Sequence, residues 1–314
     1  MKFFCLIFLI VTFTPANAFS IDANSRSTKG EKEKTQLMQN LRGNGLCFTP
    51  NKGQLADMDG KLCPDVLYKG EGNGADIYLR KTGISYVYSN AGEVMHDIDE
   101  QIEELEHSGN SDILTVQQKK QELMQQQNIK LHRVDMDFEG CLPAKASANE
   151  NGKTTTTINE FELEGYQNFY YAHCPEGITN VRQYNKVTYK NIYNNIDIAF
   201  YGDKQNGIKY DLIVQPHTDP NQIKLHWKGA ESIHINREGN LVIKTSVNEF
   251  TESIPKVYQN INGKIVDVPT KYVLTLSPSG RAGEGFINFS FSIFNFQFFI
   301  PFSNRPMGHL LWGN

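Results

Sequence analysis

Apolar and polar residues alternate along most of this chain, in short segments that end at turn-forming residues. Between Leu131 and Phe138, for example, Val134 and Met136 alternate with charged residues. Successive side chains of a β-strand point to opposite faces, so this period of two is typical of half-buried strands. The pattern recurs at 76–80, 84–88, 160–172, 186–201, 208–214, 223–227, 241–244 and 271–276. The sequence therefore predicts an all-β fold of antiparallel, sandwich-like sheets, in one large or two small lobes.

Turn residues separate the predicted strands. The segments 76–80 and 84–88 are joined by Lys81-Thr82-Gly83, which predicts a hairpin with glycine in its turn. Tyr and Phe are abundant, at 14 and 19 residues, and aromatic residues favour strands. No period of about 20 to 50 residues repeats along the chain, so we do not expect a propeller or a solenoid within it.

The pattern changes to a helical one over about 96–130. Ile98, Ile102 and Leu105 recur at helical spacing, and a second such stretch starts at Ile113. Residues 108–111 interrupt the two, which predicts a helical hairpin or a bent helix that projects from the β scaffold. We expect its apolar stripe to pack onto the body. A coiled-coil partner site is the alternative, but the stripe is short and irregular for one.

The N-terminal segment has the three parts of a secretory signal peptide. Lys2 supplies the positive end, residues 3–14 are apolar, and Ala16-Asn17-Ala18 is a small-x-small cleavage pattern. We predict a signal peptide at 1–18 and an extracellular, cell-surface or periplasmic location. The apolar run is shorter than the roughly 20 residues that span a bilayer, so we expect no transmembrane segment in the mature chain. Residues 19–45 are polar and predict a flexible leader before a β-rich module at 46–276.

Four cysteines remain after the predicted cleavage, and an exported protein can oxidise them. Four cysteines allow three disulfide connectivities. Proximity in the sequence favours Cys47–Cys63 with Cys141–Cys174, and buried thiols are the alternative. The spacings form neither a C-x-x-C pair nor a zinc cluster, so we predict no metal site.

Neither charge nor motifs predict a catalytic or nucleic-acid-binding protein. The formal charge of −4 becomes −5 without Lys2, and no basic block predicts a nucleic-acid partner. The chain contains no metalloprotease, serine-hydrolase, Walker, dinucleotide or EF-hand motif, so we expect neither an enzyme nor a cofactor. Asp197, Asp203 and Asp211 lie near aromatic strands and are the candidates for a carbohydrate hydrolase, although nothing in their spacing requires it.

Tyrosines are concentrated in one segment of the chain. Aromatic side chains on exported β-proteins stack on sugars or dock proteins, whereas alternate tyrosines along strands are also common in sheet packing. The tyrosines of this segment are Tyr166, Tyr170, Tyr171, Tyr184, Tyr189, Tyr193, Tyr201 and Tyr210. The predicted binding residues among them are Tyr184, Tyr189, Tyr193, Tyr201 and Tyr210.

Many short tracts between Phe48 and Leu276 match one family in order. They include Asn51-Lys52-Gly53-Gln54, 189–193, 208–214 and Asp219-Pro220. The chain resembles the uncharacterised N-terminal module that precedes SBBP-type β-propeller repeats in large secreted proteins, many of them from gliding bacteria. The resemblance implies a β-rich surface module, with the helical segment as an insertion. It implies no activity and no functional residues.

The C-terminal part departs from that family. Its members continue into propeller repeats and a sorting domain, whereas here 286–302 is rich in phenylalanine. Asn288, Asn295 and Gln297 in this tract argue against a membrane span. We expect 277–314 to be an atypical tail, truncated or frame-shifted, with a final strand pair as the alternative.

These observations favour an exported, non-catalytic structural or interaction module of a bacterial cell-surface or secreted assembly, with an adhesive role. Its partner would be a protein or a glycan at the cell surface. A glycan-binding module with a tyrosine-rich face is the second hypothesis, and a carbohydrate-active hydrolase is the third.

Overall fold

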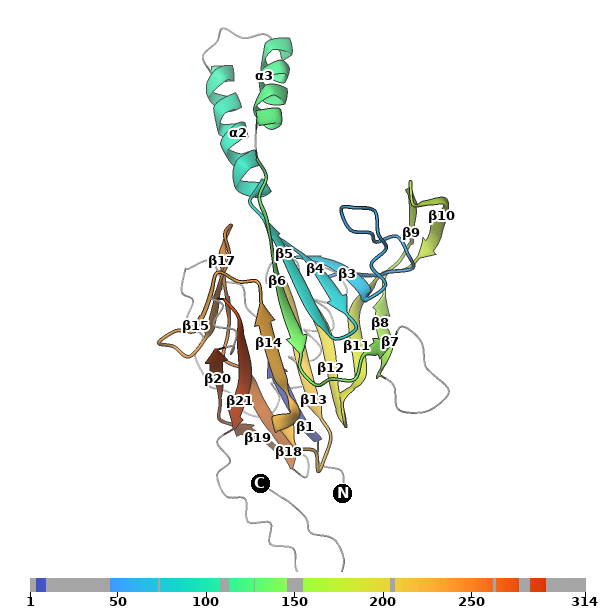
Figure 1. The fold of residues 1–314 in the computed structure, drawn as a ribbon, viewed down its shortest axis with the longest axis vertical. Helices are drawn as coiled ribbons and strands as arrows, with labels where there is room; N and C mark the ends of the chain where they lie inside the picture. The colour runs from blue at the N-terminus through green and yellow to red at the C-terminus, as the bar shows by residue number, and fades with distance from the viewer. Residues whose placement is uncertain are drawn as a thin grey trace, which may run out of the picture.

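The structure is a computed structural model of the 314-residue chain. It describes residues 4–9, 46–72, 74–107, 113–126, 128–145, 155–203, 207–261, 264–276 and 283–291. Most described elements are strands in antiparallel sheets, and a pair of helices interrupts them, which confirms the predicted all-β fold with a helical insertion (Figure 1).

The strands of the N-terminal half are β1 (Phe4–Leu9), β2 (Phe48–Pro50), β3 (Val66–Gly72), β4 (Ala75–Arg80), β5 (Gly83–Ser89), β6 (Leu131–Phe138), β7 (Ala144–Lys145), β8 (Thr155–Glu162), β9 (Gln167–Tyr171) and β10 (Cys174–Val181). The helices are α2 (Ala91–His107) and α3 (Ile113–Gln126). The later elements are β11 (Tyr184–Tyr193), β12 (Ile196–Asp203), β13 (Gly207–Val214), the short 3-10 helix η1 (Pro220–Gln222), β14 (Lys224–Lys228), β15 (Ser232–Ile235), β16 (Leu241–Lys244), β17 (Glu249–Glu252), β18 (Lys256–Ile261), β19 (Lys264–Val268), β20 (Thr270–Leu276) and β21 (Gly285–Phe291).

One 16-stranded sheet contains most of these strands. Its main path runs β19-β18-β1-β13-β12-β11-β2-β3-β4-β5-β6-β14-β21-β20, and β8 and β7 attach beside β11. All neighbours on the main path are antiparallel, as short loops between consecutive strands allow. Two small sheets, β9–β10 and β15–β16–β17, complete the described part of the fold.

The large sheet folds over so that its two halves face each other across one core. The rings of Phe138 on β6 and Phe200 on β12 lie 6.4 Å apart. The Tyr210 hydroxyl on β13 lies 3.8 Å from the Met136 sulfur on β6. Strands that are distant along the sheet therefore bury the same side chains, and these form a single hydrophobic cluster.

The hairpin expected at 76–80 and 84–88 is present as β4 and β5. Arg80 pairs with Gly83 at its turn. A Cβ atom at Gly83 would lie 2.4 Å from the Met136 carbonyl oxygen, so β6 approaches this turn as only a glycine allows.

An aromatic cluster joins the three-stranded sheet to the large sheet. Phe250 on β17 has its ring 5.0 Å from that of Tyr88 and 6.1 Å from that of Trp227. Tyr86 lies between them, with its ring 6.0 Å from Trp227. All four side chains are buried, so this cluster attaches the small sheet to the body.

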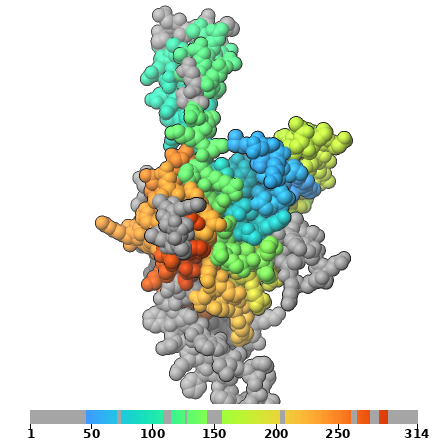
Figure 2. Space-filling view, viewed as in Figure 1, coloured from blue at the N-terminus to red at the C-terminus, as the bar shows by residue number. Residues whose placement is uncertain are grey.

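The helices form the predicted hairpin, but its position differs from the expectation. α2 begins at Ala91, and the two helices pack against each other through the buried Ile98 and Ile102, with an ion pair of 2.6 Å from Lys120 to Asp99. Figures 1 and 2 show the hairpin standing away from the sheets. The expectation that its apolar stripe packs onto the body is wrong, because that stripe is used between the helices.

Several predicted segments lie largely outside the described residues. This holds for the leader at 19–45 and for the predicted signal peptide, of which only residues 4–9 are described, as β1. Within the predicted tail, residues 285–291 form β21, which pairs with β14 and β20. Neither of the described helices is long and apolar enough to cross a membrane.

Candidate functional site

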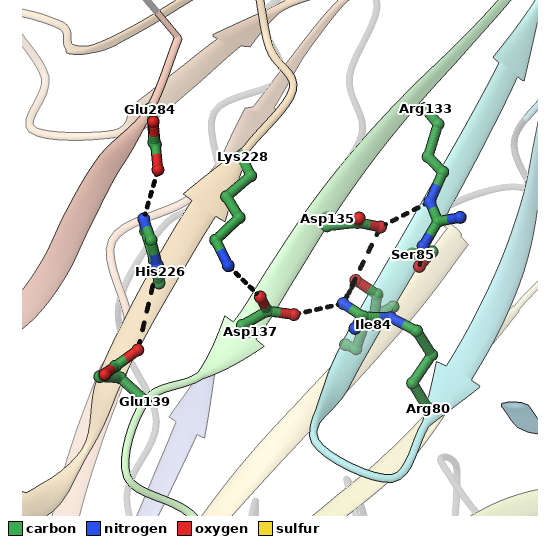
Figure 3. A network of polar contacts seen from close by, with 10 residues as sticks. All are labelled: Arg80, Ile84, Ser85, Arg133, Asp135, Asp137, Glu139, His226, Lys228 and Glu284. Carbon is green, nitrogen blue, oxygen red and sulfur yellow. Dashed lines mark hydrogen bonds and ion pairs between the residues drawn. The ribbon is translucent and has the colours of Figure 1, made fainter. Parts of the chain in front are cut away.

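Charged side chains gather on one face of the sheet where β4, β5, β6 and β14 lie side by side. The register of β6 with β14 sets Asp135 opposite Lys228 and Asp137 opposite His226. Because side chains alternate along a strand, these residues lie on the face opposite to the buried Met136. Among the residues drawn in Figure 3, we call the following group the charged strip: Arg80, Arg133, Asp135, Asp137 and Lys228.

Asp137 is the centre of the charged strip. Its Oδ1 accepts a hydrogen bond of 2.5 Å from Arg80 Nη2, and its Oδ2 accepts one of 2.7 Å from Lys228 Nζ. Partial burial of this carboxyl group raises its pKa, but the bonds from Lys228 and Arg80 outweigh burial, so the pKa of Asp137 is below its usual value. Arg80 also donates to the Ile84 carbonyl oxygen at 3.2 Å, which fixes the guanidinium across the hairpin turn.

Arg133 and Asp135 form the other part of the strip. Arg133 Nε donates to Asp135 Oδ1 at 2.8 Å, and its Nη2 donates to Ser85 Oγ at 3.2 Å. The hydrogen bond that Arg133 donates to Asp135 raises the pKa of the Arg133 guanidinium. Arg80 lies 3.8 Å from the same carboxylate. Each charge in the strip therefore has a partner within it, and the strip ties four strands together.

His226 extends this row on β14. Its ring stacks on Phe286 with centroids 4.0 Å apart. Its Nε2 lies 3.2 Å from a Glu284 carboxylate oxygen, and its Nδ1 lies 3.9 Å from one of Glu139 (Figure 3). A protonated imidazole at this position would have a carboxylate on each side.

A shallow pocket of about 250 Å³ lies beside His226. Its walls come from β14, β20 and β21 and from the residue that follows β6. In the described part of the chain, no group of three or more His, Cys, Asp or Glu side chains is arranged to hold a metal ion. The pocket is lined by Glu139, Lys224, Thr275, Phe286 and Asn288.

The tyrosines that the sequence predicts as a binding face lie mainly in the core. Tyr189, Tyr193, Tyr201 and Tyr210 are all buried, and Tyr184 is half-buried. Two of their hydroxyl groups make buried hydrogen bonds: Tyr210 donates to Glu252 at 2.6 Å, and Tyr201 donates to Asp211 at 2.9 Å. Burial raises the pKa of each of these four buried phenols. These five residues therefore do not form an exposed platform.

Other tyrosines of the same segment are exposed, on the two-stranded sheet formed by β9 and β10 or directly before it. Tyr166 is 61% exposed, Tyr170 65% and Tyr171 49%. This element projects from the body beside the loop that follows β2 (Figures 1 and 2). We call it the aromatic hairpin, and its ring-bearing side chains are Tyr166, Phe169, Tyr170, Tyr171 and His173.

Contacts within the aromatic hairpin order its rings. Phe169, Tyr171 and His173 stack in a row, with centroid distances of 6.2 Å and 5.5 Å. At its base, the Arg182 guanidinium lies 5.8 Å from the centre of the Tyr166 ring. The hairpin thus presents fixed aromatic surface rather than separate mobile side chains.

Gly177 makes room for Tyr170 on the neighbouring strand. A Cβ atom at Gly177 would lie 2.4 Å from Tyr170 Cε1 and 2.7 Å from Cδ1, and the φ of Gly177 is +77°. The Tyr170 ring therefore lies over the glycine backbone, and most of the rest of this side chain is exposed.

A family model for a domain of unknown function (DUF7948) matches residues 48–295. The chain is a member of the DUF7948 family. The match extends from β2 to the end of β21, so it includes the charged strip, the helical hairpin and the aromatic hairpin. No curated protein and no solved structure matches the chain.

The three aspartates predicted for a hydrolase occupy β12 and β13 of the DUF7948 domain. Asp197 is buried, pairs with Lys190 and accepts a hydrogen bond of 2.8 Å from the Asn191 backbone N–H, which fixes the β11–β12 turn. Burial raises the pKa of Asp211 to about 8, and its partner there is Tyr201. Asp203 ends β12, and its side chain lies outside the described residues. Two of the three carboxyl groups are therefore buried and bonded to neighbouring groups of the fold.

The predicted disulfides are absent among the described cysteines. Cys47, Cys63, Cys141 and Cys174 are all thiols. Cys141 packs against the core, where burial raises its pKa to about 11, whereas Cys174 begins β10 on the projecting hairpin. The fold thus places Cys141 and Cys174 on different parts of the molecule, whereas a disulfide needs Cα atoms about 4.4–6.8 Å apart.

Proposed function

We propose that this protein is an exported, non-catalytic interaction module that contacts its partner through the aromatic hairpin. The exposure of Tyr170 and Tyr171 on a projecting two-stranded sheet, with Tyr166 exposed directly before it, carries the proposal. Tyrosine is enriched among the residues that dominate binding energy at protein interfaces. Tyr171 is stacked between Phe169 and His173, and a ring that is already held in place loses little side-chain entropy when a partner binds.

The charged strip also supports a non-catalytic role, because its charged groups are engaged with one another. A general acid or base must be able to reach a substrate proton. Arg80, Asp137 and Lys228 instead bond to one another across β4, β6 and β14. We therefore assign the strip to stability and the aromatic hairpin to recognition.

A glycan is the second candidate for the partner, and the position of Tyr170 favours it. One face of the Tyr170 ring rests on the Gly177 backbone, and the side chain is otherwise mostly exposed. A ring held flat in this way is suited to stacking on the apolar face of a sugar. In this version of the proposal, binding is saturable and proceeds without turnover.

We also propose that the module functions in a cell-surface or secreted assembly, in an adhesive role. The signal-peptide pattern at 1–18 and the resemblance to the N-terminal module of secreted SBBP-repeat proteins support this setting.

Photo-crosslinking in the exporting cell tests the proposal. A photoreactive phenylalanine analogue replaces Tyr170 in one strain and Met58, which is 97% exposed in a loop, in a control strain. We expect discrete crosslinked products from position 170 and not from position 58. Tyr171→Ser should reduce the yield at position 170 by tenfold or more, on the scale of a binding hot spot.

A panel of polysaccharides distinguishes the two partner classes. If the partner is a glycan, the purified protein retains one polysaccharide, and Tyr170→Ser removes the retention. Equal crosslinking at positions 58 and 170, together with no retention on any polysaccharide, would contradict the proposed function.

A further inference from the structure

β1 occupies a space one strand wide between β13 and β18. Cys5 to Leu9 pair antiparallel with Tyr210 to Val214 on β13. Phe4 to Phe8 pair antiparallel with Lys256 to Asn260 on β18. The strand therefore completes the hydrogen-bond ladders of five residues on each side. β18 and β13 do not pair with each other in the strand order, so β1 alone joins them.

The segment that forms β1 is also the apolar centre of the predicted signal peptide. Cleavage after Ala18 removes residues 4–9 from the exported chain. The backbone groups of 210–214 and 256–260 would then face each other across about 9.5 Å, which is twice the spacing of paired strands. Unpaired strand edges of this kind readily accept another strand.

We propose that, in the exported protein, the slot between β13 and β18 binds an extended apolar strand donated by another protein. The inference depends on the predicted cleavage and is independent of the aromatic hairpin. In this mode the donated backbone provides the affinity through main-chain hydrogen bonds, and alternate side chains provide the specificity.

The walls of the slot define the chemistry of that strand. At its centre, Leu212 on β13 and Val257 on β18 flank the position that Ile7 holds, and both are buried, at 1% and 5% exposed. The residue placed between them is therefore apolar and faces the core. The bound segment is about five residues long and runs antiparallel to both neighbours, as β1 does.

The registers favour a strand from another protein over this chain's own C-terminal tract. Phe291, the last described residue, pairs with Thr270, two residues after Val268. Val268 pairs with Val257, which lies opposite Ile7. The chain after Val268 therefore continues towards the Leu9 end of the slot, and Phe291 lies on that side. A tract entering from that end would run parallel to β13 and β18, and parallel pairing is slightly less stable per residue.

Hydrogen exchange on the exported protein tests whether the slot is open. The gene is expressed with its own leader, and the mass of the product establishes whether the chain starts at Phe19. The probe is a synthetic peptide with the sequence of residues 4–9 between pairs of lysines. We expect the amides of 210–214 and 256–260 to exchange at least tenfold more slowly when the peptide is present.

A proline at the position of Ile7 in the peptide is the matched control. It removes one main-chain donor and is not accepted within a central strand, while the composition stays almost the same. This peptide should leave exchange in both segments unchanged.

Disulfide trapping tests the register of the bound peptide. Cys5 lies opposite Gln259, so a Gln259→Cys variant should form a mixed disulfide with the peptide under a mild oxidant. Tyr258→Cys places the thiol one residue away on the opposite face and should not. Mass mapping separates these products from those of the four native cysteines.

Three results would overturn the proposal. The first is an exported protein that retains residues 4–9. The second is slow exchange in β13 and β18 without peptide, because the slot is then closed, or filled by the chain's own tract or by a second copy. The third is a peptide that slows exchange no more than its proline control does.

Discussion

Glu252 is a carboxyl group in the centre of the core. It is fully buried, and it accepts hydrogen bonds from the hydroxyl groups of Tyr210 at 2.6 Å and Tyr272 at 2.9 Å. Burial outweighs these bonds and raises its pKa to about 7. Because the folded pKa is above the unfolded value, the folded protein binds more protons between about pH 4.5 and 7. The contribution of Glu252 to stability is therefore most favourable below pH 4.5 and declines as the pH rises through 7.

The neutral variant Glu252→Gln should remove most of this pH dependence. We expect its free energy of unfolding at pH 8 to exceed that of the wild type by about 1 to 3 kcal/mol, with little gain at pH 5. Urea unfolding at both pH values measures this difference. Glu104→Gln on the exposed face of α2 is the control and should change neither value. A loss of stability at pH 8 would show that the amide cannot serve both tyrosines.

The pKa of Asp137 is shifted in the opposite direction to that of Glu252. Its folded pKa is below the unfolded value, so its stabilising contribution is present above about pH 4 and is lost as the pH falls through the folded pKa. Asp137→Asn should lower the free energy of unfolding at pH 7 by about 2 to 3 kcal/mol, because Arg80 is only 11% exposed and loses its closer ion pair.

Lys228→Met provides the comparison for that variant. Lys228 is 43% exposed, so solvent screens its ion pair, and its loss should cost less than about 1 kcal/mol. Equal costs for the two substitutions, measured by urea unfolding at pH 7, would contradict the buried role of Arg80.

Among the elements, the aromatic hairpin depends on one close approach. Gly177→Ala introduces a Cβ that meets the Tyr170 ring and also strains a positive φ. We expect a local cost above about 1 kcal/mol and faster amide exchange over residues 167–181, with exchange in the core unchanged. Gly165→Ala is a matched control, since its φ of +88° gives the same kind of strain but its Cβ meets nothing. If the two variants exchange alike, the ring does not rest on Gly177.

The helical hairpin should be dispensable for folding. Its ends meet at the top of a strand pair: Ser89 lies opposite Leu131, and Asn90 Oδ1 accepts a hydrogen bond of 2.8 Å from the Lys130 backbone N–H. Replacement of residues 91–129 by a two-residue Asn-Gly turn should therefore join β5 to β6 directly. We expect the circular dichroism of the sheets to persist and the melting temperature to stay within a few degrees of the wild type. Loss of the cooperative transition would show that the helices support the body.

The sequence predicted the individual strands and helices better than it predicted which of them lie next to each other. The period of two at 76–88 and 131–138 identified β4, β5 and β6, and the helical spacing at 98–105 identified α2. The same alternation set Arg133, Asp135 and Asp137 on one face, which is the signal from which the charged strip could have been anticipated. Their partners on β4 and β14 lie about 50 to 90 residues away, and a strand pattern carries no information on such pairings.

The buried tyrosines show where pattern reasoning fails. On a sheet with one solvent-exposed face, every second residue is exposed, so alternate tyrosines are candidates for recognition. On β11, β12 and β13, residues at both odd and even positions are buried, and Tyr201, Tyr210 and Asp211 all lie inside. A strand covered on both faces gives no exposed side to its aromatic residues. The projecting β9–β10 pair retains that exposure.

At the scale of the whole molecule, one sheet supplies nearly all the walls of the core. β12 and β13 face β6, as the contacts of Phe138 with Phe200 and of Tyr210 with Met136 show. β11 reaches β14, where the Tyr193 hydroxyl donates to the Lys224 carbonyl oxygen. The large number of strands was foreseeable from the turns. The order in which distant strands pair was not, because loop closure rather than local pattern decides it.

The two ends of the strand order are β19 and β20, and only Pro269 separates them in the chain. The margins of the sheet are thus tied together by covalent bonds, without a shared ladder. A mechanical load that peels β20 from β21 reaches β19 and β18 through a single residue. Under a pulling force, this linkage would make the sheet resist shear as one unit and then yield abruptly, instead of losing its strands one at a time from either margin.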